Sequence, residues 1–107
     1  MQHDVRHTKP VYRTVGDVSL TMHVFDGGNT PRRARAAIVF FHGGGWRGGS
    51  PDQFFPQCRR LAAQGMVAMA AQYRLVGAGA ETVAACVADA KAALRWVARQ
   101  ADEAEHE

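Results

Sequence analysis

The sequence has few of the residues that several common functional sites require. It contains two cysteines and no C-x-x-C pair, so it supports neither a disulfide framework nor a cysteine-based zinc site, and we expect no metal. Cys58 and Cys86 both stand at apolar positions of predicted helices, where a free thiol behaves as a small hydrophobic group. No lysine follows the glycine cluster as it does in nucleotide-binding phosphate loops, so we expect no nucleotide cofactor.

Long apolar runs and strong charge are also missing. No segment reaches the length of a membrane span, and the first nine residues lack the apolar core of a signal peptide, so we expect a cytoplasmic protein. The formal net charge is +3, and its one local cluster is Arg32, Arg33 and Arg35. Because this cluster lies among glycine, asparagine and proline, we expect a solvated loop and no nucleic-acid partner.

The residues that are present suffice for one folded core. Of the 107 residues, 47% are hydrophobic, which excludes a disordered tail and allows at most one small domain. The stretch from Ala37 to Ser50, AIVFFHGGGWRGGS, organises the rest of the chain. Residues 38–41 are β-branched or aromatic without polar alternation, which predicts a central strand buried on both faces of a parallel sheet.

Three consecutive glycines follow this strand. Gly43, Gly44 and Gly45 can adopt positive φ and leave their N–H groups uncovered by side chains, so the loop can hold an oxyanion. A tight turn and a phosphate cradle are the alternatives that the glycines alone leave open.

The chain before this stretch predicts an antiparallel hairpin. Residues 1–9 are polar and are expected to form a loose lead-in. Residues 10–15 and 18–25 read as two strands joined by a Gly-Asp turn. His23 falls on the more polar face of the second strand, where we expect a surface histidine.

The chain after the glycines predicts a helix, a strand and a second helix. Ser50 is expected to cap the first helix and Gly65 to end it, with a short turn before a restart near Pro56. Residues 66–73 predict the next parallel strand, with a buried helix as the alternative. Residues 101–107 are expected to fray. The last helix carries one apolar stripe, expected to face the sheet, at Val83, Val87, Ala90, Leu94 and Val97.

Several short motifs occur in this order along the chain. They are H-G-G-G-W at 42–46 with Gly49 after it, Y-R-L at 73–75, and Asp89 followed by R-W at 95–96. In these motifs the chain resembles the α/β-hydrolase esterases and lipases, particularly the hormone-sensitive-lipase-like and acetyl-esterase-like enzymes. The resemblance implies that residues 1–107 are the N-terminal portion of a single α/β-hydrolase domain, with an antiparallel hairpin followed by parallel strands and crossover helices.

The same resemblance assigns roles by position. The backbone N–H groups of Gly44 and Gly45 would be the oxyanion-hole donors in the hydrolysis of a small carboxylic ester. His42 would support the loop, and Gly43 and Trp46 would contribute to substrate binding. No cofactor is implied.

The nucleophile and its partners are not found. The chain has no G-x-S-x-G turn, Ser19 falls within a strand, and Ser50 is expected to be a helix cap rather than part of a dyad with His42. We therefore expect this chain alone to be inactive. The alternatives are a non-catalytic half-domain that pairs with a second polypeptide, an inactive fragment, and an anion-binding module.

Two structural expectations follow from the resemblance. The family's sheet order is 1-2-4-3-5, so without a fifth strand the strand at 38–41 has an unpaired apolar edge. We expect this edge to favour self-association or docking of a complementary chain. We also expect Arg74 and Asp89 to form a charge-assisted pair, with two unrelated solvated charges as the alternative.

Overall fold

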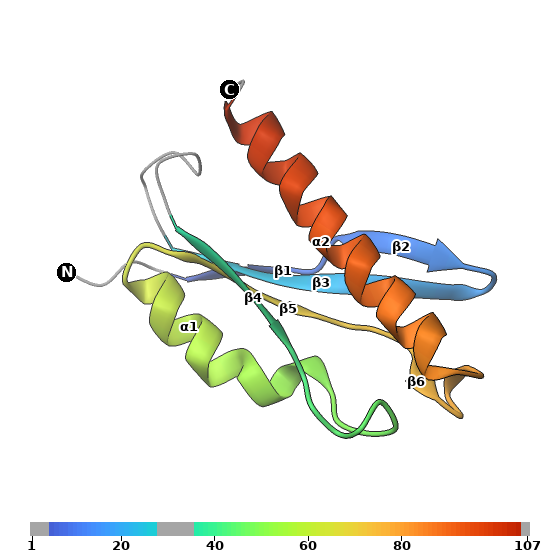
Figure 1. The fold of residues 1–107 in the computed structure, drawn as a ribbon. Coiled ribbons are helices and arrows are strands. Elements are labelled where there is room, and N and C mark those ends of the chain that lie inside the picture. The colour runs from blue at the N-terminus through green and yellow to red at the C-terminus, as the bar shows by residue number, and fades with distance from the viewer. Residues whose placement is uncertain (1–4, 28–35, 106–107) are drawn as a thin grey trace.

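The computed structural model describes residues 5–27 and 36–105, and the statements below concern these residues. A five-stranded sheet has the order β1-β3-β5-β4, and β2 also pairs with β3 (Figure 1). The strands are β1 Arg6–Thr8, β2 Val11–Val15, β3 Val18–Asp26, β4 Ala37–Phe41 and β5 Val67–Ala71. Because β3 pairs antiparallel with β5 and β4 pairs parallel with it, the predicted α/β class with a mixed sheet is confirmed.

The predicted hairpin is formed by β2 and β3. Val15 and Val18 are partners across a two-residue turn, and Gly16 adopts a φ of 56° there, which favours glycine. Along β3, Leu20, Met22 and Val24 are buried on one face, as the period of two predicts.

The first nine residues differ from the expectation of a loose lead-in, because Arg6–Thr8 form β1 against β3. His7 lies opposite Phe25, and their rings stack with centroids 4.1 Å apart. This aromatic contact holds a polar segment on the sheet, which hydropathy alone does not predict. Residues 1–4 and the predicted arginine loop, 28–35, lie outside the described residues.

The connection from β4 to β5 is a helical crossover. It consists of a 3₁₀ turn, η2 (Pro51–Phe54), and α1 (Phe55–Ala63), which confirms the predicted restart near Pro56. Gly65 has a φ of 96° and ends the helix, its N–H donating to the carbonyl oxygen of Ala62 over 2.9 Å. Ser50 has extended backbone at the N-cap position, but its hydroxyl donates to Asp52 instead of capping a backbone N–H, so that detail of the prediction was wrong.

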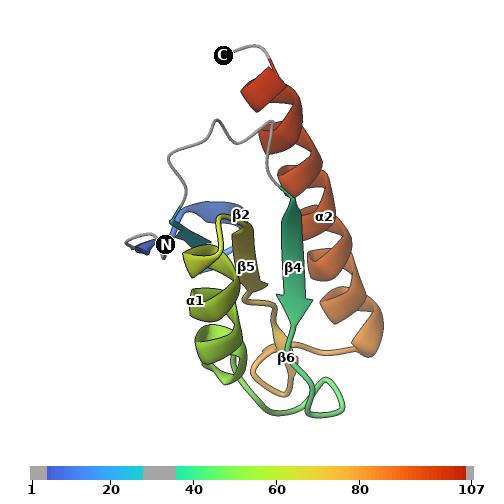
Figure 2. The same cartoon turned by 90° about the vertical axis from the view of Figure 1, so that its left-hand side faces the viewer.

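The sheet is covered on both faces. Figures 1 and 2 show α1 on one face and α2 (Val83–Glu105) on the other. The buried side chains between α1 and the sheet are Cys58 and Ala62 of the helix and Phe25, Ala68 and Ala70 of the strands. The buried side chains under α2 include Leu20, Met22, Val24, Met69 and Ala93. Alanines at both places let the helices approach the sheet closely.

Within the described residues no helix is both long and apolar enough to cross a membrane.

The orientation of α2 differs from the predicted apolar stripe. The side chains that it buries are Cys86, Asp89 and Ala93, whereas Val83 and Leu94 are 44% and 52% exposed. The reason is that Arg74 and Arg13 hold Asp89, which turns Val83 and Leu94 of the predicted stripe toward solvent, whereas Val97 packs against the core as predicted. The helix also continues to Glu105, so most of the segment expected to fray is helical.

The strand β4 lies at the end of the described sheet rather than in its centre. Its side chains from Ile38 to Phe41 are half-buried, not buried on both faces as predicted for a central strand. Figure 2 looks onto β4, with α1 on its left and α2 on its right. After β5, a small ribbon of β6 (Leu75–Val76) and β7 (Gly79–Ala80) leads into α2.

The buried thiol of Cys58 predicts a loss of stability in alkali. Burial raises its pKa from 9.0 to about 11, so the unfolded chain loses this proton first as the pH rises. The free energy of unfolding is therefore expected to fall by about 2 kcal/mol between roughly pH 9 and pH 11. Denaturant titrations across this range measure the slope. Cys58→Ala should remove this part of it, leaving the contribution of Tyr12, whose pKa burial also raises. The same slope in both proteins would contradict the assignment.

Candidate active site

The glycine loop after β4 turns back on itself. Gly44, Gly45 and Trp46 have φ values of 131°, 64° and 69°, so three consecutive residues are in the positive range. The carbonyl oxygen of Gly44 accepts hydrogen bonds from the N–H groups of Arg47 and Gly48 at 3.1 and 3.2 Å. Trp46 is the one non-glycine residue in the described chain with positive φ, a conformation that its surroundings must stabilise.

Two of the glycines are required sterically. A Cβ atom on Gly44 would lie 2.3 Å from the carbonyl oxygen of Gly48, and one on Gly49 would lie 2.2 Å from that of Gly43. Real Cβ atoms do not approach so closely, so any other residue would open the loop. The H-G-G-G-x-x-x-G spacing therefore has a structural reason: the backbone of Gly43 and Gly44 packs directly against the backbone of Gly48 and Gly49.

Several backbone N–H groups of the loop have no hydrogen-bond partner among the described residues, and two of them belong to the predicted donors. Within the described part of the chain, the N–H groups of Gly44 and Gly45 donate no hydrogen bond, and both residues are exposed. Neighbouring N–H groups in a turn of this kind form a concave site that favours an anion. The N–H groups of Gly44 and Gly45 are therefore available to a ligand from outside the loop.

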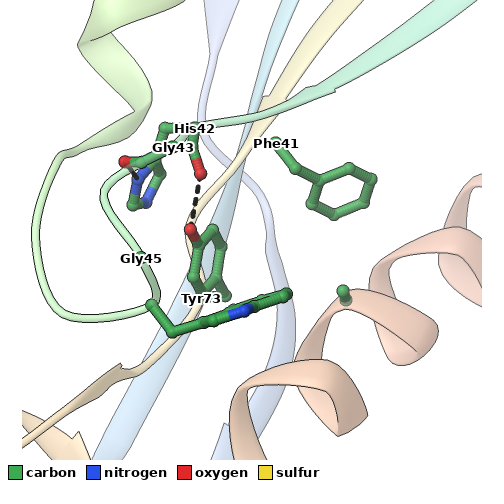
Figure 3. Close-up of a pocket in the computed structure, with 7 residues that line it drawn as sticks. Phe41, His42, Gly43, Gly45 and Tyr73 are labelled. Atoms are coloured by element: carbon green, nitrogen blue, oxygen red, sulfur yellow. Dashed lines mark hydrogen bonds between the residues drawn. The ribbon is translucent and has the colours of Figure 1, made fainter. Parts of the chain in front are cut away.

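His42 and Tyr73 support the loop from the side of β5 (Figure 3). The imidazole of His42 is 4% exposed and stacks on the Tyr73 ring, with centroids 4.3 Å apart. The Tyr73 hydroxyl donates to the His42 carbonyl oxygen over 2.5 Å, and burial raises the pKa of this hydroxyl. The Nδ1 atom of His42 lies 3.2 Å from the Gly43 carbonyl oxygen. His42 thus contacts the loop through its side chain, and it contacts Tyr73 through both its ring and its carbonyl oxygen.

Trp46 lies on the other side of Tyr73. Its ring meets the Tyr73 ring edge to face at 5.4 Å, and its carbonyl oxygen accepts a 2.7 Å hydrogen bond from the N–H of Val76. These two contacts hold the strained backbone of Trp46. An apolar cavity of about 280 Å³ lies here, and its walls are Phe41, His42, Gly43, Gly45, Trp46, Tyr73 and Ala90.

The structure brings the predicted site residues together and adds three that the sequence reasoning missed. His42, Gly43, Gly45 and Trp46 line the cavity, and Gly44 stands between them in the loop. The additions are Phe41, Tyr73 and Ala90. Tyr73 belongs to the Y-R-L motif, but nothing in the sequence indicates that its hydroxyl reaches a carbonyl oxygen 31 residues away.

The segment that carries Tyr73 is anchored by the next residue. Arg74 donates to Asp89 through its backbone N–H and Nε, both 2.9 Å from Oδ2, and through Nη2, 3.1 Å from Oδ1. Asp89 is fully buried, and Arg13 of β2 approaches it to 3.6 Å. The hydrogen bond from Arg74 to Asp89 and the charge of that carboxylate raise the pKa of Arg74. The expected charge-assisted pair is therefore present, and it is buried rather than solvated.

The described residues contain no assembled nucleophile. The Ser50 hydroxyl donates to Asp52, Ser19 is exposed on β3, and no serine hydroxyl of the described chain hydrogen-bonds an imidazole. Nor does this part of the chain gather three or more histidine, cysteine or acidic side chains that might share a metal ion. Within the described residues, the geometry thus places unpartnered backbone N–H groups beside an apolar cavity.

The chain is similar to solved esterases. A structure of a thermophilic esterase from the planctomycete Thermogutta terrifontis shares 48% identity with a TM-score of 0.83, covering 92% of this chain and 35% of the esterase. Its butyrate-bound form matches with the same identity and TM-score and is covered to 36%. Esterase 2 of the same organism phosphorylated by paraoxon shares 50% identity, with a TM-score of 0.79, 90% of this chain and 37% of that one.

The chain thus spans a little over a third of the length of these esterases. No curated protein matches it significantly. A family model described as the alpha/beta hydrolase fold matches residues 38–107, from β4 through α2. With this match over more than half of its residues, and its likeness to solved esterases, the chain belongs to the α/β-hydrolase fold family.

Proposed function

We propose that this chain supplies the oxyanion-binding part of a carboxylic ester hydrolase. The observation that carries the proposal is the pair of unpartnered N–H groups at Gly44 and Gly45, beside an apolar cavity of about 280 Å³. Two donors fixed by the fold stabilise charge that develops on a carbonyl oxygen, at no cost of reorganisation during the reaction. An ester carbonyl under nucleophilic attack develops such a charge.

In this proposal the remaining chemistry comes from outside these 107 residues. A serine hydroxyl attacks the ester carbonyl, a histidine takes its proton, and a carboxylate orients the histidine. The oxyanion of the tetrahedral intermediate binds the N–H groups of Gly44 and Gly45. His42 and Tyr73 hold the loop, while Trp46 and Gly43 border the bound substrate. By itself the chain is expected to be inactive.

The substrate class proposed is small acyl esters. The cavity is walled by aromatic rings and by Ala90, with backbone from Gly43 and Gly45. A cavity with such apolar walls suits an alkyl group. Solved forms of the Thermogutta terrifontis esterase hold propionate and butyrate. These relatives support a short acyl group in the substrate proposed here as well.

A chimera tests the proposal. It joins this chain to the part of the Thermogutta terrifontis esterase that the chain does not cover, and hydrolysis of p-nitrophenyl butyrate is measured. The chimera is expected to be active and the chain alone inactive. Gly44→Ala should lower kcat by about 100-fold or more, because its Cβ would meet the Gly48 carbonyl oxygen at 2.3 Å and displace a donor.

Gly48→Ala is the matched control within the same loop. A Cβ atom there would come no closer than 4.0 Å to the Gly44 carbonyl oxygen, so kcat should change by less than about threefold. Equal losses in the two variants, or full activity of Gly44→Ala, would contradict the role of the loop. Activity of the chain alone would instead direct attention to Ser50.

A second candidate function is supported by the apolar surface beside β4. This strand ends the described sheet with half-buried side chains. On α2, Ala90 borders the same cavity as Phe41, and Leu94 follows one turn later with 52% of its surface exposed. The sheet edge and this side of the helix thus form one apolar surface. We propose that the chain is a half-domain that binds a second polypeptide there, or a second copy of itself.

Light scattering coupled to gel filtration tests this association. The chain is expected to elute above its monomer mass of 11.6 kDa, and Leu94→Gln should shift it toward that mass. Val11→Gln is the matched control, because Val11 is equally exposed at 52% but lies on β2, away from β4. A parent chain that is monomeric and unfolds in one sharp, reversible transition would rule the candidate out.

A further inference from the structure

Two histidines outside the candidate active site lie side by side under α1. The Nε2 atom of His7, in β1, is 2.9 Å from the Nδ1 atom of His23, in β3. His7 is exposed and His23 half-buried, so solvent reaches the pair. The two residues are 16 positions apart in sequence, and the pairing of β1 with β3 is what brings them together.

Aromatic side chains fix both imidazoles. The ring of His7 stacks on Phe25 at 4.1 Å, and Phe55 of α1 packs at 5.2 Å from His7 and at 4.8 Å from His23. Rings that are already held by packing lose little conformational entropy when they bind a ligand. The pair is therefore preorganised, unlike two isolated surface histidines.

The separation of the nitrogens suits a shared metal ion. With metal–nitrogen bonds of 2.0–2.1 Å and an angle of 90–110° at the metal, two imidazole nitrogens stand about 2.9–3.4 Å apart. The observed 2.9 Å lies at the short end of this range. We propose that His7 and His23 form a two-histidine site for a divalent transition-metal ion of the zinc type, which ties β1 to β3.

Binding requires one change in the pair. One imidazole now donates its N–H to the other, and it must take its second tautomer so that both facing nitrogens present lone pairs. No proton needs to leave the protein. Since no set of three candidate ligand side chains lies together in the described residues, water completes the coordination of the metal.

The neighbouring charges limit the affinity. Arg59 acts on His7 and Lys9 acts on both imidazoles, and these cations oppose a bound metal ion, whereas Asp52 acts on His23 and favours one. Burial lowers the pKa of both imidazoles, which keeps them in the neutral form that binds metals. With two cations near and one carboxylate, we expect a weak site that a simple zinc titration detects.

Calorimetric titration of the whole chain with zinc chloride tests the site. The parent is expected to bind one equivalent at this pair, and His7→Ala and His23→Ala should each raise the Kd by about tenfold or more. His106→Ala removes another of the five histidines and should bind as the parent does. Zinc should also raise the Tm of the parent, but not that of His7→Ala.

A second measurement uses only the parent chain, so its result does not depend on whether the alanine variants fold. In the parent chain, zinc should shift the imidazole proton resonances of His7 and His23 and leave that of the buried His42 in place. A Kd unchanged in both alanine variants, or resonances of the pair that do not respond to zinc, would overturn the proposal.

Discussion

The buried carboxylate of Asp89 is the constraint on which the rest of the structure depends. A carboxylate without water must be paired, and Asp89 receives three hydrogen bonds from Arg74 alone, with Arg13 at 3.6 Å. These contacts join α2 to both β2 and the segment after β5. They also fix the rotation of the helix, because the face that carries Asp89 must turn toward the sheet. The apolar residues at Val83 and Leu94 are left exposed as a result.

The same pair positions the candidate active site indirectly. Arg74 follows Tyr73, so fixing Arg74 also fixes the hydroxyl that donates to the His42 carbonyl oxygen. Val76, two residues further on, donates to Trp46. The glycine loop is therefore held at its first and last residues by one short segment. Between these two points the chain has only glycines, and Gly44 and Gly45 have positive φ and N–H groups without a hydrogen-bond partner among the described residues.

The helices, strands and turns could be predicted from the sequence better than the tertiary contacts between them. The hairpin turn, the break before Pro56 and the glycine end of α1 depend on local backbone chemistry, so a short stretch suffices to predict them. The α2 stripe was wrong at Val83 and Leu94 because hydropathy takes no account of a buried ion pair. The strand β1 was missed since its contact with Phe25 joins distant residues. In the loop, the motif located the glycines, but the support from Tyr73 depends on tertiary structure.

These contacts predict that Arg74 and Asp89 act as one energetic unit. A double-mutant cycle on the free energy of unfolding tests it, with Arg74→Met, Asp89→Asn and the double variant. Each single change removes the opposite charge from a buried partner and should cost about 3 kcal/mol. The double variant should cost less than the sum, with a coupling energy above about 1 kcal/mol. Additive losses, with no coupling between the two positions, would contradict the account.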